Sequence, residues 1–124
     1  ILASRVHELI ECKTMEIDAN FRLMFVSVGT YEQAKRIAEV LISNNLAACC
    51  SIIPGIESIY RWNDAIMCEQ EFLLKIKTFD HAIENIEKSI QEIHSYTIPE
   101  MIVMPIQGIH EPYLQWAKEQ TIRD

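Results

Sequence analysis

Two glutamates, Glu69 and Glu71, stand two positions apart within a run of residues that favour β-structure. Because side chains alternate between the two faces of a strand, both carboxylates point to one face, which they share with Leu73, Lys75 and Lys77. One interpretation is a solvated polar face, whose ion pairs contribute little stability. The other is a cleft between subunits, where burial perturbs the two carboxylates and makes them candidate metal ligands.

Cys49 offers a soft thiolate, the kind of ligand that copper or zinc prefers. It lies in the small, apolar run 47–52, so we favour the alternative that it is a buried core residue. On the partner strand of a hairpin, Cys68 would face Ile59 or Tyr60, roughly 30 Å along the strands from Cys50. Ligands of one ion lie ~4 Å apart, so a cysteine metal site needs a neighbouring subunit or a nearby histidine.

A third group of polar residues stands close together in an expected loop, which contains His94, Tyr96 and Glu100. His94 is a candidate metal ligand, although a lone histidine at the end of a helix more often caps the last carbonyl groups. We expect Lys77 and Glu100 to lie near the end of the sheet beside Tyr96. These three residues are the candidate cleft or ligand residues.

Several classes of function lack their signature. The chain has only three glycines and contains neither a phosphate-binding loop, nor G-x-S-x-G, nor H-E-x-x-H, so we predict that it is not an enzyme. Its net charge of -7 does not suit a nucleic-acid partner, and no apolar run is long enough for membrane insertion. Four cysteines are too few for a disulfide scaffold, which favours reduced thiols and a cytoplasmic location.

The 124 residues fit one domain, which we place at residues 21–124. Residues 1–20 are expected to be a frayed N-terminal extension. The apolar run 23–28 predicts a central strand. Thr30 and Gln33 form a capping box for a helix over 31–43, and Asn44–Asn45 ends that helix.

The longest predicted feature is a hairpin with arms 46–62 and 66–78, joined by a tight turn at Asn63–Asp64. A second helix capped by Thr78 or Asp80 follows, then an edge strand over 101–106 and a short helix over 112–119. The order is βαββαβ plus a tail helix. This predicts an α+β, ferredoxin-like sandwich with both long helices on one face.

The arms of this hairpin are too long for the helices that must cover them. They reach roughly 50 Å, whereas helices of about 14 residues span about 20 Å. The far half would leave apolar surface and strand edges exposed, so we expect it to pair with other copies of the chain in a closed ring. The candidate interface residues are Pro54, Ile56, Ile59, Tyr60, Trp62 and Trp116.

An ordered set of short motifs between Met24 and Thr121 resembles the CutA family, the divalent-cation tolerance proteins. The motifs are Asn45-Leu46-Ala47-Ala48-Cys49, Ile53-Pro54-Gly55, Tyr60-x-Trp62, Glu69-x-Glu71, Lys77-Thr78, Tyr96-x-x-Pro99-Glu100 and Tyr113-Leu114-x-Trp116. The family usually has x-Gly-Lys after the tryptophan, where this chain has Asn63-Asp64-Ala65.

The resemblance implies a homotrimer built by strand pairing between subunits. It also implies a role in tolerance to copper or another divalent cation, with weak metal binding at inter-subunit sites involving Cys49, His94, Glu69 or Glu71. One alternative is a regulatory trimer similar to PII proteins, which would bind a small anion through Lys75, Lys77 and Arg61. Another is a structural protein that anchors partners.

Overall fold

The computed structural model describes residues 15–16 and 20–121. Its elements are β1 (Met15–Glu16), β2 (Phe21–Val28), α1 (Tyr31–Ser43), β3 (Cys49–Trp62), β4 (Ala65–Phe79), the 3-10 turn η1 (Asp80–Ala82), α2 (Ile83–Ile93), β5 (Met101–Pro105), β6 (Ile109–His110) and α3 (Glu111–Gln120).

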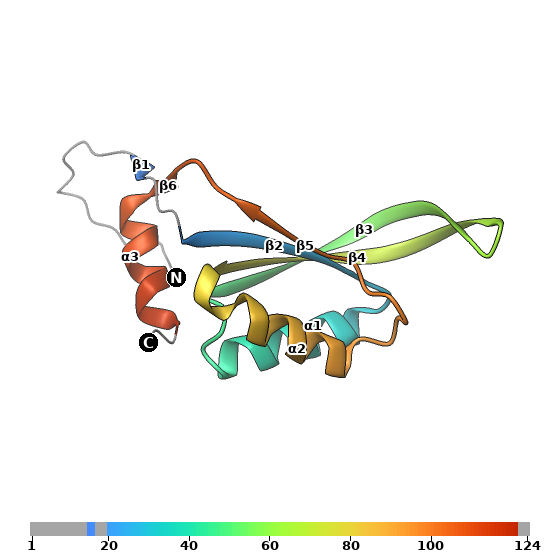
Figure 1. Cartoon of the computed structure of the whole chain (residues 1–124), viewed down its shortest axis with the longest axis horizontal. Helices are drawn as coiled ribbons and strands as arrows, with labels where there is room; N and C mark the ends of the chain where they lie inside the picture. Colours follow the sequence, from blue (N-terminus) through green and yellow to red (C-terminus); the bar gives the residue numbers. More distant parts are fainter. Residues whose placement is uncertain (1–14, 17–19, 122–124) are drawn as a thin grey trace.

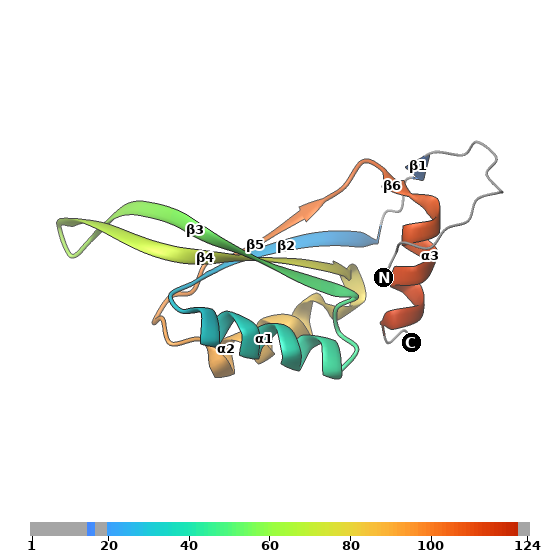
Figure 2. The same ribbon diagram turned by 180° about the vertical axis from the view of Figure 1, so that it is seen from behind.

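The main sheet has four antiparallel strands in the order β3-β4-β2-β5, and α1 and α2 lie side by side on one of its faces (Figures 1 and 2). This confirms the predicted α+β, ferredoxin-like sandwich, with β2 in the interior of the sheet. Pro105 lies on the edge strand β5, as its missing N–H requires. The core between helices and sheet is apolar and includes Val26, Leu74, Ile76, Ile37, Leu41, Ile86 and Ile90.

Helix α1 begins and ends where the sequence indicates. The Thr30 hydroxyl accepts a hydrogen bond from the Gln33 N–H at 3.2 Å, and Asn45 ends the helix with a φ of 57°. The reciprocal half of the capping box is not formed, because the Gln33 side-chain oxygen accepts from the Ser95 N–H at 3.1 Å. Gln33 therefore fastens the loop after α2 to the start of α1.

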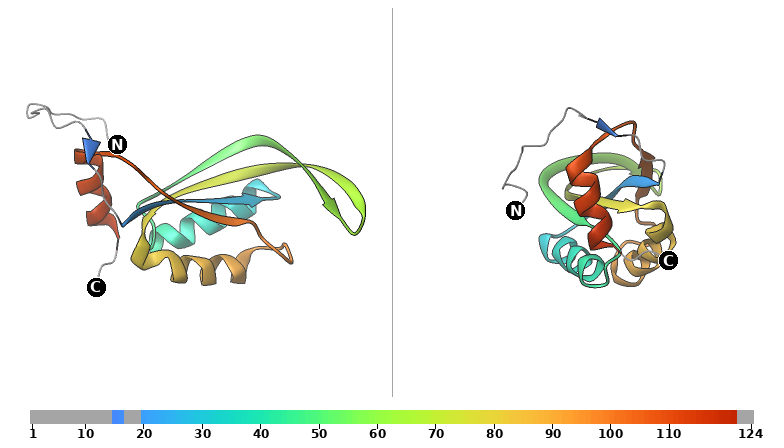
Figure 3. Two further views of the ribbon diagram at one scale, coloured as in Figure 1. Left: turned by 45° about the horizontal axis from the view of Figure 1, so that its top comes forward. Right: turned by 90° about the vertical axis from the view of Figure 1, so that its left-hand side faces the viewer.

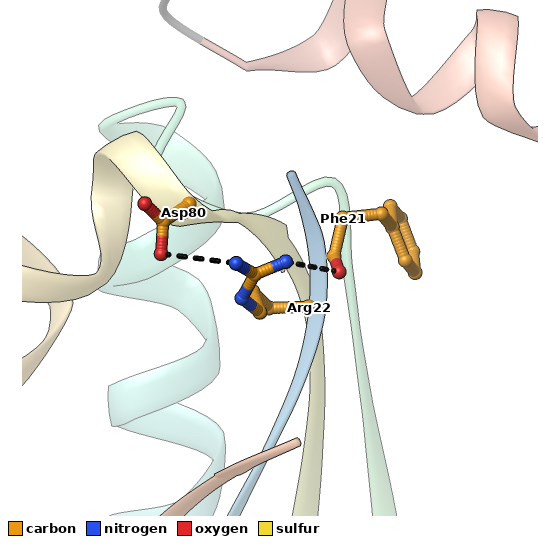
Figure 4. Close-up of polar contacts among 3 residues, drawn as sticks. All are labelled: Phe21, Arg22 and Asp80. Atoms are coloured by element: carbon orange, nitrogen blue, oxygen red, sulfur yellow. Dashed lines mark hydrogen bonds and ion pairs between the residues drawn. The ribbon is translucent and has the colours of Figure 1, made fainter. Parts of the chain in front are cut away.

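The expected cap of the second helix is wrong. Neither η1 nor α2 has a side-chain cap, since the Thr78 hydroxyl donates to the Leu46 carbonyl at 2.7 Å. The Asp80 carboxylate instead lies 3.5 Å from the Arg22 guanidinium, which also donates to the Phe21 carbonyl at 3.0 Å (Figure 4). Asp80 thus ties the start of η1 to the first residues of β2.

The hairpin of β3 and β4 extends well beyond the ends of α1 and α2 (Figure 1). Its turn has positive φ at both Asn63 and Asp64, as a two-residue hairpin turn requires. The register shifts between Ile53 and Ile56, where Pro54 and Gly55 together oppose one residue of β4. This is a β-bulge, and Gly55 adopts a φ of 80° within it.

The C-terminal helix α3 stands at the end of the sheet remote from the hairpin tip (Figure 3). It is one residue longer at each end than predicted, and it packs in a second apolar cluster that contains Phe21, Phe79 and Leu114. A short pair of strands, β1 and β6, lies beside it and was not predicted. The expectation of a frayed extension falls mostly on residues 1–14 and 17–19, which lie outside the described residues.

Candidate functional site

A pocket of about 790 Å³ lies on the sheet face opposite the helices, at the base of the protruding hairpin. Its walls come from β3, from β4, from the end of β2 and from the loop between α2 and β5. The lining residues are Ser27, Ser58, Ile59, Tyr60, Trp62, Met67, Glu69, Glu71, Ser95, Tyr96, Thr97, Ile98 and Glu100.

The bulge determines which residues of β3 face this pocket. Before the bulge Ile53 opposes Leu73, and after it Ser58 opposes Glu69 and Tyr60 opposes Met67. Opposed residues of an antiparallel pair place their side chains on one face. Before the bulge, the odd-numbered residues of β3 are on the pocket face. The bulge inserts one extra residue, so after it the even-numbered residues, including Tyr60 and Trp62, are on that face.

Glu71 is the most enclosed charged group of the pocket, with 5% of its surface exposed. The Tyr96 hydroxyl donates to Glu71 Oε2 at 2.6 Å, a short, charge-assisted hydrogen bond. Burial, followed by this hydrogen bond and by the charges of Glu71 and Glu69, raises the pKa of Tyr96 well above its ordinary value of 10.0. Tyr96 therefore stays protonated and serves Glu71 as a donor.

Two further carboxylates complete the acidic lining. Glu69 hydrogen-bonds with Tyr60, whose pKa is raised by desolvation first and by this contact second. Glu100 Oε1 accepts from the Ser27 hydroxyl at 2.8 Å. Three carboxylates thus line the pocket, and its lining contains no lysine, arginine or histidine.

His94 holds the loop that carries Tyr96 through two hydrogen bonds, and Gly29 leaves space for the Tyr96 side chain. His94 Nδ1 accepts from the Tyr96 N–H at 3.1 Å, so Nε2 carries the hydrogen and donates to the Ser27 carbonyl at 2.8 Å. Both ring nitrogens are occupied and the residue is buried, which makes His94 a positioning residue in a single chain. A Cβ on Gly29 would lie 3.1 Å from the Tyr96 hydroxyl oxygen, so this glycine leaves room for the phenol.

Cys49 and Lys77 form a separate cluster on the same sheet face. Lys77 Nζ lies 3.5 Å from Cys49 Sγ and donates to the Ser51 hydroxyl at 2.5 Å. The pKa of Tyr113 rises to about 12 through burial, then through the charge of Cys49 and a hydrogen bond with it. Burial also raises the pKa of Cys50 to about 12.

The predicted site residues therefore divide into two places. Glu69, Glu71, Tyr96 and Glu100 line the pocket of the single chain, with His94 behind Tyr96, and the cleft between subunits stays a prediction. The expectation that Lys77 lies beside the Tyr96 loop is wrong: Lys77 pairs with Leu23 and Cys49, six residues along β4 from Glu71 and about 20 Å away.

Among the described cysteines, Cys68 lies far along the hairpin from Cys49 and Cys50 of the same chain. Cys68 opposes Ile59, as predicted, and its thiol donates to Glu57 at 3.1 Å near the hairpin tip. Within residues 20–121, no three His, Cys, Asp or Glu side chains are grouped so that they could hold one metal ion.

Sequence analysis missed six lining residues, namely Ser27, Ser58, Met67, Ser95, Thr97 and Ile98. Alternation along β4 from Glu71 identifies Met67, and alternation back from Tyr60 identifies Ser58. Ser27 carried no local signal, because its place beside Glu100 depends on the pairing of β2 with β5.

The candidate interface residues of the hairpin are largely exposed in the single chain. Ile59 is 68% exposed and Trp62 46%, and Ile66, on the other arm, is 69% exposed. Trp116 differs, because it packs with Tyr113 in the second apolar cluster at the opposite end of the sheet.

Two relatives illustrate the similarity of this chain to known proteins. It is 38% identical over 99 residues to the "Divalent-cation tolerance protein CutA" of Thermus thermophilus, a match that covers 80% of this chain and 96% of that protein. It is 39% identical over 99 residues to the rice "Protein CutA 1, chloroplastic", where the match covers 80% of this chain and 56% of the relative.

The solved structure of CutA1 from Oryza sativa superimposes with a TM-score of 0.82 at 37% sequence identity, covering 86% of this chain and 97% of that one. The family model described as "CutA1 divalent ion tolerance protein" matches residues 22–120. That range contains the sheet, the helices, the pocket and the Cys49 cluster. The chain belongs to the CutA1 divalent ion tolerance family.

Proposed function

We propose that this protein acts in divalent-metal tolerance as a homotrimer that binds a divalent cation, copper among the candidates, at sites completed between subunits. The family and the names of the relatives support the metal-tolerance part. The observation that carries the binding part is the pocket itself, where a buried carboxylate, Glu71, lies with two others and no basic side chain.

The donor groups of the pocket suit a divalent cation but do not complete its coordination. Carboxylate oxygens from Glu69, Glu71 and Glu100 are ligands for hard or borderline metal ions. Because no three such groups converge within residues 20–121 of one chain, the missing ligands would come from a neighbouring subunit. Cys49 would supply a softer ligand for copper or zinc at the second cluster, and His94 would have to give up its contacts with Tyr96 and Ser27 to take part.

Calorimetric titration with zinc and copper(II) tests this proposal. We expect Glu69→Gln with Glu71→Gln to weaken binding by about tenfold or more, because each substitution removes a charged ligand. A matched control is Glu57→Gln with Glu84→Gln, which makes the same change of net charge outside the pocket. Equal metal affinity of the two double variants would contradict the pocket as the binding site. The role of the Cys49 thiol is tested separately by comparing the metal affinity of Cys49→Ser with that of Cys68→Ser.

The trimer is supported by the exposed apolar surface of the hairpin. Beyond the helices, Ile59, Trp62 and Ile66 face solvent in a single chain, and the outer edge of β3 and the edge of β5 are unpaired within the four-stranded sheet. Strand pairing between copies would cover the apolar residues and the unpaired strand edges. Closure of the assembly into a ring would limit it to a defined number of copies.

A small anion is less well supported as a ligand of this pocket. Lys75, Lys77 and Arg61 are absent from the lining, whereas three carboxylates are present. The family name describes ion tolerance and no reaction, so we infer a binding role, not a catalytic one.

We place the protein in a reducing, cytoplasmic environment. Cys49, Cys50 and Cys68 are free thiols, as such an environment keeps them. None of the helices in the described part of the chain is long and apolar enough to cross a membrane.

A further inference from the structure

We propose that Lys75 of one copy enters the pocket of a neighbouring copy and neutralises Glu69 and Glu71 there, so that a divalent cation must displace this ammonium group to bind. The proposal rests on the homotrimer of the proposed function, in which another copy covers the pocket. It adds the basic residue that the neighbouring copy contributes, and it makes assembly and metal binding compete for the same carboxylates.

The sheet face that carries the pocket has no layer of its own over its centre. Helices α1 and α2 lie on the other face (Figures 1 and 2), and α3 stands at the end remote from the hairpin tip (Figure 3). The apolar side chains in this centre belong to neither apolar cluster of the described chain, and they are Phe25, Ile53, Leu73, Ile102 and Met104. A sheet face of this kind needs a covering layer. Because it continues into the exposed apolar surface of the hairpin, a second copy is the expected cover.

The charges on this face are separated along β4. Two carboxylates stand toward the hairpin tip and two ammonium groups toward α3, on alternate residues from Glu69 to Lys77, with Leu73 between them. Among the described residues no ion pair joins the two groups, since the side-chain ion pairs found there involve other residues. Unlike charges attract across an interface and like charges repel. The face therefore favours a head-to-tail arrangement, with the basic end of one copy against the hairpin base of the next.

Lys75 is the basic residue that suits this role. On the pocket face β4 pairs it with Phe25 and Ser51, and within residues 20–121 its half-buried ammonium group has no hydrogen bond or ion pair. Lys77 on the same face already donates to Ser51, and Arg61 lies on the opposite face of the hairpin. The lysines and arginine of α1 and α2 lie on the other side of the sheet.

The pocket supplies the partner that this ammonium group lacks. Glu71 is buried, and Tyr96 donates to its Oε2 atom, so Oε1 can accept from a neighbouring copy. Buried charges are normally paired, and a lysine ammonium group has three donors, enough to contact Glu71 and Glu69 together. Divalent cations bind the same carboxylate oxygens, so the ammonium group and a metal ion exclude each other.

Sedimentation equilibrium of the full chain in moderate urea tests the contact through the dissociation constant of the assembly. Lys75→Met removes the charge and keeps most of the apolar stem. We expect the dissociation constant to rise about tenfold per contact, the effect of losing one charge-assisted contact. Lys35→Met is the matched control, because Lys35 is exposed on α1 and its substitution changes the net charge equally. Equal dissociation constants for the two variants would overturn the proposal.

A double-mutant cycle identifies the carboxylate that Lys75 meets. If the two groups pair between copies, Lys75→Met combined with Glu71→Gln should weaken the assembly by less than the sum of the single effects, because neither group is then left buried without its partner. Strictly additive effects would overturn the pairing. Circular dichroism checks that each variant is folded, and if Glu71→Gln is not, Glu69→Gln takes its place in the cycle.

Calorimetric titration with zinc keeps this proposal separate from metal binding itself. At concentrations where both variants are assembled, Lys75→Met should bind zinc about tenfold more tightly than Lys35→Met, because no ammonium group has to leave. Equal or weaker binding by Lys75→Met would overturn the competition. An assembled protein that binds no zinc would refute the metal alone, and the urea measurements would still decide the contact. A monomeric original chain would refute the homotrimer and this proposal together.

Discussion

Glu71 and Tyr96 are the pair of residues on which the pocket depends. Among residues 20–121, the Tyr96 hydroxyl is the hydrogen-bond donor to the buried Glu71 carboxylate, so removing it leaves a buried charge without that contact. We expect Tyr96→Phe to lower the free energy of unfolding by about 1.5–3 kcal/mol, the range for hydrogen bonds to charged groups. Urea denaturation measures this change.

Tyr31→Phe is the matched control for that substitution. Tyr31 is exposed, and its ring contacts Phe72 edge-on, so removing its hydroxyl should change stability by less than about 0.5 kcal/mol. An equal loss in both variants would mean that the Tyr96–Glu71 contact contributes nothing specific.

The same phenol predicts how stability depends on alkaline pH. Burial and then the Glu71 hydrogen bond raise the pKa of Tyr96 above its ordinary value of 10.0. A group whose pKa is higher in the folded state stabilises that state while protonated, so its contribution is complete below pH 10 and is lost as pH rises above it. Above about pH 10, the free energy of unfolding should fall more steeply in the original protein than in Tyr96→Phe. Parallel curves would contradict this assignment.

At the scale of elements, the bulge in β3 controls the composition of the pocket. Gly55 has a φ of 80° and nothing within 4 Å of an added Cβ, so Gly55→Ala meets only backbone strain. We expect a loss of about 1–2 kcal/mol in the free energy of unfolding. Arg61→Ala, on an exposed part of the same strand, is the control and should be nearly neutral. A neutral Gly55→Ala would show that the bulge has another conformation in solution.

Local signals predicted some elements well and others poorly. Thr30 and Asn45 identified both ends of α1, because a cap depends on residues adjacent in sequence. The start of α2 could not be predicted in that way, because Asp80 is drawn to Arg22 of a distant strand and Thr78 to Leu46. The turn at Asn63–Asp64 was a local feature and was found.

In the candidate site too, features that depend on neighbouring residues were predicted, and features that depend on strand pairing were not. Alternation along one strand placed Glu69 and Glu71 together correctly. Lys77 was misplaced because its distance from Tyr96 depends on the register between β2 and β4, where Lys77 meets Leu23 and not the end of the strand. Pro54–Gly55 is recognisable in the sequence as a break in the strand. Which sheet face Tyr60 and Trp62 occupy could not be predicted from it, because that depends on how β3 pairs with β4.

At the scale of the whole molecule, the hairpin projects past the helices with apolar residues on both arms (Figure 1). Ile66→Lys should therefore shift the protein toward smaller species, because it places a charge in the surface that we assign to contacts between copies. Ile42→Lys is the matched control, since Ile42 is an exposed isoleucine on α1. Sedimentation velocity at several concentrations distinguishes the two, and identical behaviour would argue against this surface.

Multi-angle light scattering of the original chain in dilute buffer tests the central claim most directly, namely that the projecting hairpin is completed by other copies. We predict a single species of about 43 kDa, three times the chain mass of 14.4 kDa. A folded species of 14.4 kDa would contradict the account.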